Sequence, residues 1–518
     1  MKICILTAGK GSRIGSLCKN INKALLPIDH KAIISQIIEK FDKDDTFVIG
    51  LGYKKEQVKK YLKITHPDKK FIFVNIKNHD GPGSGPGLSL LSCKKHLNEP
   101  FVFVPCDCNF LSKFPNAPNQ NWIGISKVPI EETHQYCNVL VKNYKVKEIK
   151  DKEKSPKEYF AFTGLTYIKD YNIFWKGLKE GILIQNEHQI SNGLRKLMKD
   201  SNLHTKKIKW QDMGTLEQFK EMQRRSKLKN IAKDNEFIYF ERDKVVKFFD
   251  MEEIIDKKMI KSKLKPNFFP KIKKFEKNFF SYDYWKGEIF YESGTPTEFK
   301  KFLEYMNKKF WISYDNNEKN MEKLCDSFYH KKTVDRVQLF LESNPEYTIP
   351  KFVNGEFVLS INEILNKIPW KELTKGIPCF IHGDLNFSNI LYNKKDEKFL
   401  LIDWRQDFSG ETEFGDLYYD LAKLYAGIIM NFNHIIKKQY NYFEKGEKIK
   451  ISFKQWRFRE KYIKVLEDFI ISKKLDVTKV RLLAGITFLN MAPLHPNPIN
   501  KILIAYGQLI ITKVLKEK

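Results

Sequence analysis

Two segments of this 518-residue sequence carry residue types suited to handling phosphate groups. The first, Leu6–Arg13 (L-T-A-G-K-G-S-R), includes the end of a short apolar run. Glycine lets a backbone bend sharply and approach a ligand closely, which leaves N–H groups free to face phosphate oxygens. Arg13 adds a planar fork for phosphate, and Lys23 adds a point charge further along. The segment predicts a phosphate-binding loop, although it matches neither the P-loop nor the dinucleotide fingerprint.

The second segment, Ile381–Leu391, has the pattern H-x-D-x-x-x-x-N, and an apolar run that ends in Asp403 follows it. These residue types suit the transfer of a phosphoryl group from ATP to a hydroxyl. Asp384 can accept the proton of the hydroxyl, while Asn389 and Asp403 can hold Mg²⁺ over the ATP phosphates. The segment therefore predicts a kinase-type catalytic loop.

Short apolar runs alternate with amphipathic stretches in the first half of the chain. We expect strands at Ile3–Leu6, Phe47–Leu51, Phe71–Val74 and Phe101–Val104, and helices at 31–42 and 54–63. Such alternation is typical of a mostly parallel sheet with helices on both faces. We expect the domain boundary in the basic stretch around 224–234.

The second half has a different pattern. Residues from 236 to about 290 are rich in alternating Phe and Tyr, which predicts a small antiparallel sheet. Beyond 297 helical periodicity dominates, apart from a strand–turn–strand at about 379–404. We expect an α/β domain followed by an α+β domain.

The first segment resembles the sugar-phosphate and phosphocholine nucleotidyltransferase family. That family carries L-x-A-G-x-G-[ST]-R followed by P-K-x-L-x-P, and here Asn22 replaces the proline before Lys23. Further segments keep the family's order over about residues 1–222. They resemble its base-contacting loop, its metal-binding aspartate after an apolar strand, its substrate-side strand and its W-x-D-x-G-T element: Gly83–Gly87, Asp107, Phe162–Tyr167 and Trp210–Thr215.

The resemblance implies a Rossmann-like (GT-A-type) domain that binds a nucleoside triphosphate with Mg²⁺. It makes Asp107 and Asp212 the metal ligands, and Arg13 and Lys23 the catalytic cations. The implied nucleotide-binding residues are Leu6, Ala8, Gly9, Gly11, Ser12, Arg13, Lys23, Gly83, Ser84 and Gly85.

The second segment resembles the aminoglycoside phosphotransferase and choline kinase family, a branch of the protein-kinase-like fold. The resemblance implies that Asp384 is catalytic and that Asn389 and Asp403 bind Mg²⁺. Lys247, in K-V-V-K-F, is the candidate for the ATP-phosphate lysine. We expect His382 to order the catalytic loop. We expect Asp416 and Asp420 to cap and brace it, and Tyr282–Glu288 to be the hinge that holds adenine.

The chain departs from the protein kinases. No G-x-G-x-x-G precedes the Lys247 segment, and the D-F-G and A-P-E motifs are absent. We expect a small-molecule kinase for this reason.

The chain is strongly basic, with 91 Lys and Arg against 63 Asp and Glu and a net charge of +28. Such an excess attracts polyanions. The basic residues are spread along the chain and form no arginine-rich arm, so we favour a basic surface without nucleic-acid binding. The alternative is a basic nucleic-acid- or membrane-binding protein whose enzyme domains are inactive.

The N-terminus runs directly into the first apolar strand, and no run of about 18 apolar residues exists, so we expect neither a signal peptide nor a membrane span. The eight cysteines are expected to be reduced, as in a cytoplasmic protein. Cys106 and Cys108 could form a metal pair, but no second pair completes a site, so we favour core packing.

These observations predict a fusion of two enzymes, with a nucleotidyltransferase at 1–225 and a kinase at 236–518, whose N-lobe is about 236–290 and C-lobe about 291–518. The kinase phosphorylates an alcohol with ATP, and the transferase joins that phosphate, or one derived from it, to a nucleotide. The family resemblance suggests CTP and a CDP-linked precursor for a capsule or other surface glycan. The acceptor alternatives are a sugar or polyol, slightly favoured, and choline or ethanolamine. Homo-oligomer formation stays open.

Overall fold

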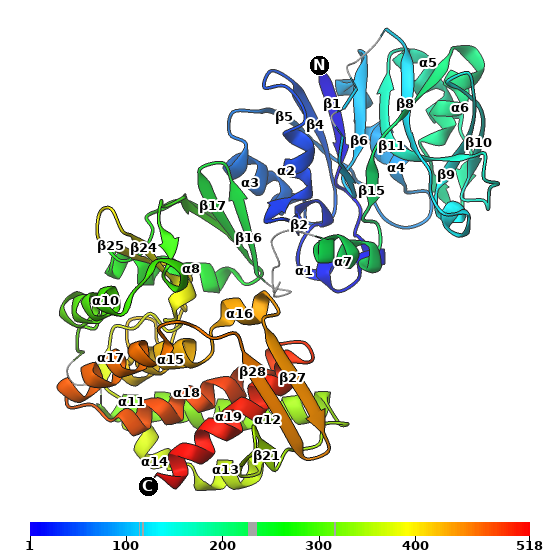
Figure 1. Cartoon of the computed structure of the whole chain (residues 1–518). Helices are drawn as coiled ribbons and strands as arrows, with labels where there is room; N and C mark the ends of the chain where they lie inside the picture. The colour runs from blue at the N-terminus through cyan, green and yellow to red at the C-terminus, as the bar shows by residue number, and fades with distance from the viewer. Residues whose placement is uncertain (113, 116–118, 226–235, 315–317, 518) are drawn as a thin grey trace. The chain divides into compact units, whose positions relative to one another are not determined.

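The computed structural model describes residues 1–112, 114–115, 119–225, 236–314 and 318–517 (Figure 1). Contacts divide the chain into two compact units. Unit 1 comprises Met1–Met251 and Lys273–Tyr282, and unit 2 comprises Glu252–Ile272 and Asp283–Lys518. The boundary expected around 224–234 falls mostly outside the described residues, so the division into 1–225 and 236–518 stays a prediction. The contacts group the strands after residue 236 with unit 1.

Unit 1 is built on a nine-stranded sheet of order β5-β4-β1-β6-β11-β8-β14-β10-β9. Its strands are β1 (Lys2–Leu6), β4 (Thr46–Leu51), β5 (Lys70–Asn75), β6 (Phe101–Pro105), β8 (Asn121–Ser126), β9 (Cys137–Lys142), β10 (Lys145–Asp151), β11 (Phe160–Ile168) and β14 (Leu203–Lys207). β1 runs parallel to β4 and β6, and β4 runs parallel to β5. β11 runs antiparallel to β6 and β8. The structure confirms the α/β class and the four predicted strands.

Helices cover both faces of this sheet. They are α1 (Leu17–Asn20), α2 (Ile33–Ile38), α3 (Lys55–Thr65), α4 (Pro86–Ser92), α5 (Tyr171–Glu180), α6 (Ser191–Asp200) and α7 (Leu216–Arg225). Neighbouring residues of β1 point to opposite faces. Ile3 and Ile5 pack in one hydrophobic cluster with α2, α3 and α7, while Cys4 packs in the other with α4, α5 and α6. Burial on both faces explains why the parallel strands read as continuous apolar runs.

The helix expected at 31–42 is shorter in the structure and spans Ile33–Ile38. Residues before it form a hairpin of β2 (Pro27–Ile28) and β3 (Lys31–Ala32). Asp29 and His30 in its turn both have positive φ, which is the requirement of a tight two-residue hairpin. The turn therefore delays the helix by two residues.

Cys106 and Cys108 follow the expectation of core packing. All eight cysteines are free thiols. Cys106 and Cys108 are buried in the hydrophobic cluster that holds α2 and α3. Among the described residues no group of three or more His, Cys, Asp or Glu side chains is arranged to hold a metal.

A four-stranded sheet of order β16-β17-β19-β18, in which β16 and β17 run antiparallel, extends the core of unit 1. Its strands are β16 (Glu236–Glu241), β17 (Lys244–Phe249), β18 (Ile272–Glu276) and β19 (Phe279–Asp283). Tyr239 and Phe248 share a hydrophobic cluster with Tyr61 of α3. The Tyr239 hydroxyl donates to the backbone oxygen of Leu25 at 2.8 Å, two residues after Lys23. The sheet predicted at 236–290 is present, and β16 packs on the segment that carries Lys23.

A buried polar chain joins β16 to α3. The Tyr61 hydroxyl donates to Glu241 Oε1 at 2.6 Å and lies 2.9 Å from the Ser35 hydroxyl, which lies 2.8 Å from Nε2 of His66. Burial raises the pKa of Glu241. A buried polar group that loses its partner keeps its desolvation penalty, so these hydrogen bonds stabilise unit 1 only while every partner is present.

Tyr61→Phe is expected to lower the free energy of unfolding of unit 1 by about 1–3 kcal/mol, because Glu241 stays buried and loses its donor. Chemical denaturation of the full chain measures this change. Tyr144→Phe is the matched control, since Tyr144 is 79% exposed. Equal stability of the two variants would contradict a stabilising role for these buried hydrogen bonds.

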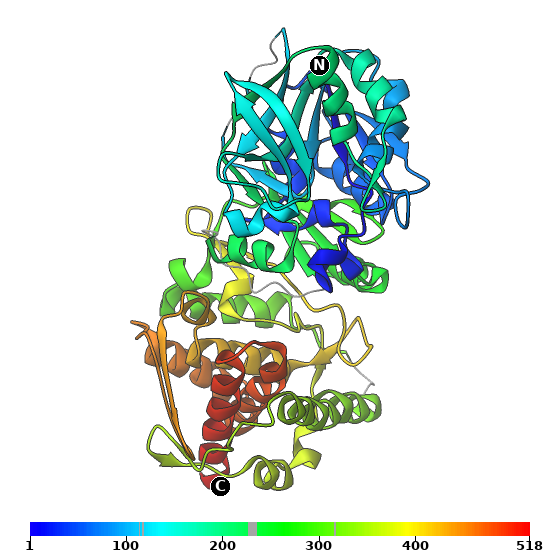
Figure 2. The same ribbon diagram turned by 90° about the vertical axis from the view of Figure 1, so that its right-hand side faces the viewer.

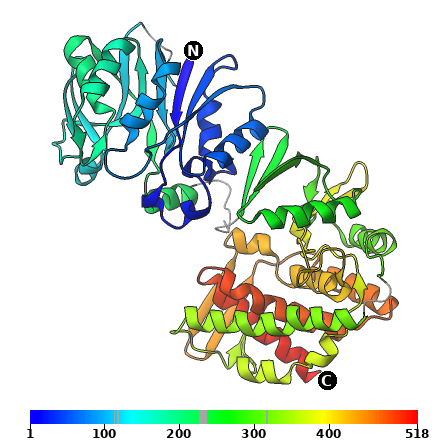
Figure 3. The same ribbon diagram turned by 180° about the vertical axis from the view of Figure 1, so that it is seen from behind.

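Unit 2 is mainly helical beyond residue 297, as predicted. Its helices are α8 (Glu252–Leu264), α9 (Phe290–Ser293), α10 (Pro296–Lys309), α11 (Glu318–Cys325), α12 (Lys332–Ser343), α13 (Ile361–Lys367), α14 (Trp370–Leu373), α15 (Leu417–Ile429), α16 (Phe432–Ile436), α17 (Arg459–Ser472), α18 (Val477–Met491) and α19 (Ile499–Lys516). α18 packs against α15, α12 and α19 (Figure 2, Figure 3). Most of its residues are buried. Among the described residues no helix combines the length and apolar character that crossing a membrane requires.

The strands of unit 2 are short. They are β20 (Glu288–Ile289), β21 (Phe352–Val353), β22 (Glu356–Phe357), β23 (Pro378–Cys379), β24 (Ile390–Asn393), β25 (Lys398–Leu401), β26 (Gly415–Asp416), β27 (Tyr440–Lys445) and β28 (Lys448–Phe453). β24 and β25 form the predicted strand–turn–strand. The hairpin β27–β28, which also pairs with β21, was not predicted. Gly446 in its turn has φ +54°, and alternate β28 residues such as Ile449 and Ile451 are buried.

Candidate active sites

Strand pairing brings the two predicted metal ligands of unit 1 together. Asp107 follows β6, and Asp212 ends β15 (Trp210–Asp212). β15 pairs antiparallel with β7 (Cys108–Phe110), with Asp212 opposite Cys108. The backbone N–H of Met213 donates to the Asp107 backbone oxygen at 2.9 Å. Both carboxylates are half-buried. They lie near the end of β6, the strand that pairs with β1.

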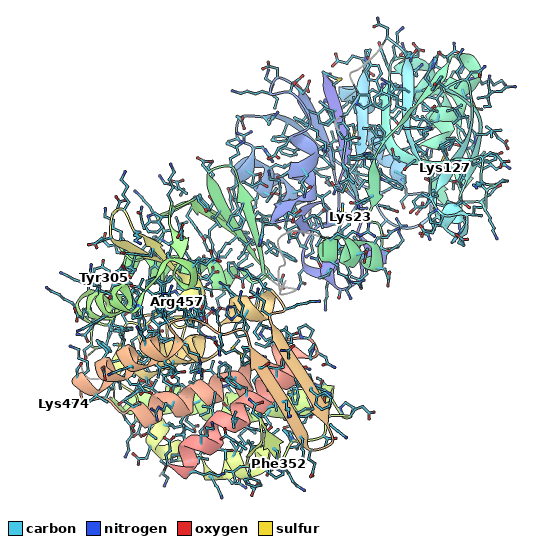
Figure 4. All side chains as sticks on the ribbon, viewed as in Figure 1. Lys23, Lys127, Tyr305, Phe352, Arg457 and Lys474 are labelled. Carbon is cyan, nitrogen blue, oxygen red and sulfur yellow. The ribbon has the colours of Figure 1, made fainter. Side chains whose placement is uncertain are left out.

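The two predicted catalytic cations reach the same place. Lys23 (labelled in Figure 4) donates through Nζ to Asp107 Oδ2 at 2.7 Å. Arg13 and Asp212 both lie next to Gly214. A Cβ placed on Gly214 would lie 3.1 Å from Arg13 Nη2 and 3.3 Å from Asp212 Oδ1. Arg13, Lys23, Asp107 and Asp212 thus form one charged group, which we call the unit 1 site.

The two carboxylates of the unit 1 site have different electrostatic surroundings. Burial favours the neutral form of Asp107, but Lys23 and Arg13 outweigh it and lower the pKa of Asp107. Burial and the negative charge of Asp107 raise the pKa of Asp212. Asp212 also accepts from the Gly214 backbone N–H at 3.0 Å. Two hard carboxylates beside two cations fit a site where Mg²⁺ would share its coordination with substrate phosphates.

Asn22 takes over the position where the family has proline. Its side chain is fully buried and ties two loops together: Nδ2 donates to the backbone oxygens of Thr7 at 2.9 Å and Tyr53 at 2.7 Å. Its Oδ1 accepts from the Ala24 N–H at 2.9 Å. The amide therefore fixes the start of the phosphate loop against the turn that contains Lys23.

The glycine loop leaves an open surface beside these cations. A Cβ at Gly9 would meet no heavy atom within 4 Å, and Ser12 is exposed. Gly11 has φ +70°, and a Cβ there would lie 2.8 Å from the Cys18 sulfur. Gly11 is thus required for conformation and for packing, whereas Gly9 faces open space. Leu6 and Ala8 lie at the end of β1 and just after it.

The predicted base-contacting loop is anchored on another hairpin. The Gly83 N–H donates to the Asn186 backbone oxygen at 2.8 Å, and the His188 N–H donates to the Ser84 oxygen at 2.7 Å. Gly85 has φ +126°, and a Cβ there would lie 2.7 Å from the His188 oxygen. These contacts hold the loop at the start of α4, against β12 (Leu183–Ile184) and β13 (Glu187–His188). An ion pair between Lys10 and Asp80 connects the two glycine-rich regions.

The predicted catalytic loop of unit 2 is centred on Asp384. Lys423 of α15 places Nζ 2.7 Å from Asp384 Oδ1. Asn389 Nδ2 donates to the Asp384 backbone oxygen at 2.8 Å and to Oδ2 at 3.2 Å. Lys423 was missed in the sequence. The available signal was its place with Asp420 as the only two charged residues of the otherwise apolar and tyrosine-rich α15.

Asp420 and His382 brace this loop, as expected. Asp420 accepts from the backbone N–H groups of His382 and Gly383, both at 2.8 Å, and from the Trp311 indole at 3.0 Å. His382 Nε2 lies 2.9 Å from the Ile402 oxygen, and its Nδ1 accepts from the Asp384 N–H at 3.1 Å. Burial lowers the pKa of His382 to about 3, so the ring is neutral and orders the backbone.

Asp416 has the expected capping role. Its Oδ1 accepts from the Tyr418 N–H at 3.2 Å at the start of α15 and from the Ile377 N–H at 2.9 Å. Its Oδ2 accepts from the Tyr329 hydroxyl at 2.8 Å. Asp416 is fully buried. This carboxylate serves the fold of unit 2.

Backbone bonds hold the second predicted metal ligand next to the first. The Ile402 N–H donates to the Asn389 oxygen at 2.9 Å, and the Arg405 N–H donates to the His382 oxygen at 3.0 Å. Asp403 lies between these two donors and has φ +58°, a left-handed conformation that Asp tolerates. Asn389 uses its amide nitrogen on Asp384, which leaves its amide oxygen as a hard donor. Asn389 and Asp403 therefore suit Mg²⁺.

The predicted ATP lysine lies in the other unit. Lys247 is on β17, opposite Ile238 of β16, and is 3% exposed. Its role as the ATP-phosphate lysine stays a prediction, as does the hinge at Tyr282–Glu288.

Two family models match the chain. Residues 3–113 match the MobA-like NTP transferase domain, and residues 351–444 match the phosphotransferase enzyme family. The bifunctional protein GlmU of Methanocaldococcus jannaschii is 28% identical over 218 residues, covering 41% of this chain and 51% of the relative. The UTP–glucose-1-phosphate uridylyltransferase AglF of Haloferax volcanii is 23% identical over 175 residues, covering 32% and 70%. The chain spans about half the length of the GlmU relatives it matches.

A solved UDP-glucose pyrophosphorylase complexed with UDP-glucose is similar at 22% identity and a TM-score of 0.37, covering 43% of this chain and 96% of its own. Arg13, Lys23 and Asp107 of the unit 1 site lie within the first matched region, and Asp212 lies outside it. The catalytic loop around Asp384 lies within the second matched region. The chain thus combines an N-terminal MobA-like NTP transferase domain with a C-terminal domain of the phosphotransferase enzyme family.

Proposed function

We propose that the chain catalyses two reactions: ATP-dependent phosphorylation of a small alcohol, and transfer of a nucleotidyl group to that phosphate or to one derived from it. The observation that supports the proposal is a charged group in each unit, with two oxygen-bearing side chains that would suit Mg²⁺, beside a family match in each half of the chain. In unit 1 these side chains are Asp107 and Asp212, and in unit 2 they are Asn389 and Asp403.

In the transferase reaction an oxygen of the acceptor phosphate attacks the α-phosphorus of a nucleoside triphosphate. The bond from the α-phosphorus to its bridging oxygen breaks, and pyrophosphate leaves. The nucleophile is already an anion, so the site needs positioning and charge neutralisation and no general base. Lys23 and Arg13 neutralise phosphate oxygens, and the N–H groups near Gly9 and Gly11 line the open side. Mg²⁺ held by the two aspartates would neutralise the triphosphate.

In the kinase reaction the acceptor hydroxyl attacks the γ-phosphorus of ATP, and ADP leaves. Asp384 accepts the hydroxyl proton, while Lys423 holds the carboxylate in place through its 2.7 Å contact. Mg²⁺ held by Asn389 and Asp403 would bind the ATP phosphates. We infer a two-lobed kinase-like architecture for this half and a GT-A-type architecture for the transferase half.

The proposed nucleotide is CTP, which would give a CDP-linked precursor for a capsule or other surface glycan made in the cytoplasm. This assignment rests on the family resemblance of the motifs. Relatives of the transferase domain are named as a uridylyltransferase and as a guanylyltransferase acting on a heptose phosphate. The base is therefore the first variable to test. A basic binding protein with inactive domains is the alternative of another class.

The test incubates the full chain and Mg²⁺ with ATP, CTP, GTP, UTP or dTTP over a panel of alcohols and alcohol phosphates. Acceptor-dependent ADP and pyrophosphate are read separately. We expect ADP with ATP and a free alcohol, and pyrophosphate with CTP and an alcohol phosphate. Salt-sensitive binding to DNA or anionic vesicles without either product would favour the binding-protein alternative. Pyrophosphate with another triphosphate in place of CTP would overturn the CTP assignment alone.

A further inference from the structure

Lys332 interacts electrostatically with Asp384 and with three other cationic side chains of unit 2, one of which, Lys423, contacts Asp384 directly. Three of these four cations lie outside the motifs read from the sequence and outside the mechanism above. Two come from the first turns of α12, one lies two residues after Asp403, and one comes from α15. We call this set the cation cluster: Lys332, Arg336, Arg405 and Lys423.

One aromatic ring organises the cluster. Lys332 Nζ lies 3.8 Å from the centroid of the Phe328 ring, and the Arg405 guanidinium carbon lies 4.9 Å from the same centroid. Phe328 is buried and stacks on Phe408 at 4.3 Å. Arg336 lies one turn after Lys332 on the same face of α12. The Phe328 ring therefore brings Lys332 of α12 and Arg405 of the metal-ligand segment together.

The positive charges of the cluster repel one another. Burial and the charges of Arg405, Arg336 and Lys423 lower the pKa of Lys332 to about 7, against the opposing charge of Asp384. Lys423 is 9% exposed and already uses the Asp384 carboxylate. Cations held close together in a partly buried site attract an anion strongly, because little water screens them.

We propose that the acceptor of the kinase site carries an anionic group, a carboxylate or a phosphate, next to the hydroxyl that is phosphorylated. The proposal rests on the kinase reaction proposed above and adds the charge of its substrate. Lys332 and Arg336 bind the anionic group, which brings the hydroxyl to Asp384. An ammonium group of choline or ethanolamine would meet these same cations and be repelled, so the site selects against amino alcohols.

The phosphates of ATP are a second anionic group that these cations can bind. Lys423 and Arg405 adjoin the catalytic aspartate and the metal-ligand segment, so they are placed to meet the transferred phosphate as well. Lys332 and Arg336 come from α12, which carries none of the predicted ATP or metal residues. We therefore assign the α12 pair to the acceptor, and kinetics with each substrate varied in turn distinguish the two sources.

The first experiment measures ADP formation with matched acceptors: glycerol, glycerate, glycerol 3-phosphate, choline and ethanolamine. We expect kcat/KM to be highest for the two anionic compounds. Arg336→Gln is expected to raise the KM for the anionic acceptor about tenfold or more, the effect of one lost charge-assisted hydrogen bond, with kcat and the KM for ATP little changed. Arg336→Lys should recover part of the loss. Lys331→Gln, at an exposed position beside Lys332, is the matched control.

A second measurement does not depend on choosing the natural acceptor. With the ATP site saturated by a non-hydrolysable ATP analogue and Mg²⁺, inorganic phosphate is titrated into the full chain by calorimetry. We expect binding to the wild-type protein and to Lys331→Gln, and about tenfold weaker binding to Arg336→Gln. Three results would each overturn the proposal. They are the absence of phosphate binding, faster turnover of choline or glycerol than of glycerate and glycerol 3-phosphate, and an effect of Arg336→Gln on the KM for ATP in place of the KM for the acceptor. Acceptor-independent ADP with every compound would instead refute the kinase reaction itself.

Discussion

Asp384→Asn is expected to lower acceptor-dependent ADP formation by about 10²–10⁴-fold, the usual contribution of a general base. The asparagine has nearly the same shape and keeps the loop contacts, but its amide cannot accept the hydroxyl proton. It also removes the negative charge that Lys423 contacts at 2.7 Å. Steady-state assays coupled to ADP measure the loss, and pyrophosphate release with a phosphorylated acceptor should stay at the wild-type rate.

Two controls separate chemistry from folding in this experiment. Asp396→Asn makes the same substitution at an exposed turn between β24 and β25 and should leave both activities unchanged. Denaturation of Asp384→Asn shows whether the unpaired Lys423 destabilises unit 2. A folded Asp384→Asn protein that forms ADP at the wild-type rate would show that another group accepts the proton. Loss of both activities in equal measure would show that the two sites are not independent.

The effect of Asp384 depends on residues that never touch a substrate. Asp420 binds two successive backbone N–H groups of the loop, and neutral His382 joins the loop to the segment before Asp403. A buried carboxylate that accepts three hydrogen bonds is costly to replace, because each donor would be left unpaired. The catalytic aspartate is therefore positioned by a second aspartate 36 residues later in the chain.

The sequence was sufficient for the local features of both sites. The glycine loop, Lys23 and the H-x-D-x-x-x-x-N pattern are short segments, so their spacing is visible without a fold. The parallel strands were also predictable, because burial on both faces makes them continuous apolar runs. The start of α2 was not, because the β2–β3 turn depends on two left-handed residues, Asp29 and His30, that are not glycine.

Long-range contacts account for what was missed. Lys332 and Arg336 read as ordinary lysine and arginine in an amphipathic helix, and only the folded structure shows that Lys332 shares the Phe328 ring with Arg405. The contact of Tyr239 with Leu25 likewise joins residues 214 positions apart. Periodicity reports which face of an element is buried and does not report which partner covers it.

Asp107→Asn is expected to lower pyrophosphate release by about 10²–10³-fold, while ADP formation stays unchanged. Asp107 has two functions in the unit 1 site: it contacts Lys23 at 2.7 Å and supplies one of the two carboxylates that would hold Mg²⁺. The neutral amide keeps the volume but weakens both interactions. Since Lys23 and Arg13 lower the pKa of Asp107, the wild-type side chain stays ionised throughout the neutral range.

The dependence on Mg²⁺ separates the two functions of Asp107. If the metal role dominates, Asp107→Asn needs more Mg²⁺ for half-maximal pyrophosphate release, and added Mg²⁺ recovers part of the rate. If orientation of Lys23 dominates, added Mg²⁺ has no effect, and Lys23→Met causes a similar loss. Asp44→Asn, at an exposed turn before β4, is the matched control. A folded Asp107→Asn protein could compensate only if another carboxylate lay beside Lys23, and the substitution introduces none. Wild-type pyrophosphate release by this protein would therefore show that the Asp107 carboxylate has no part in the reaction.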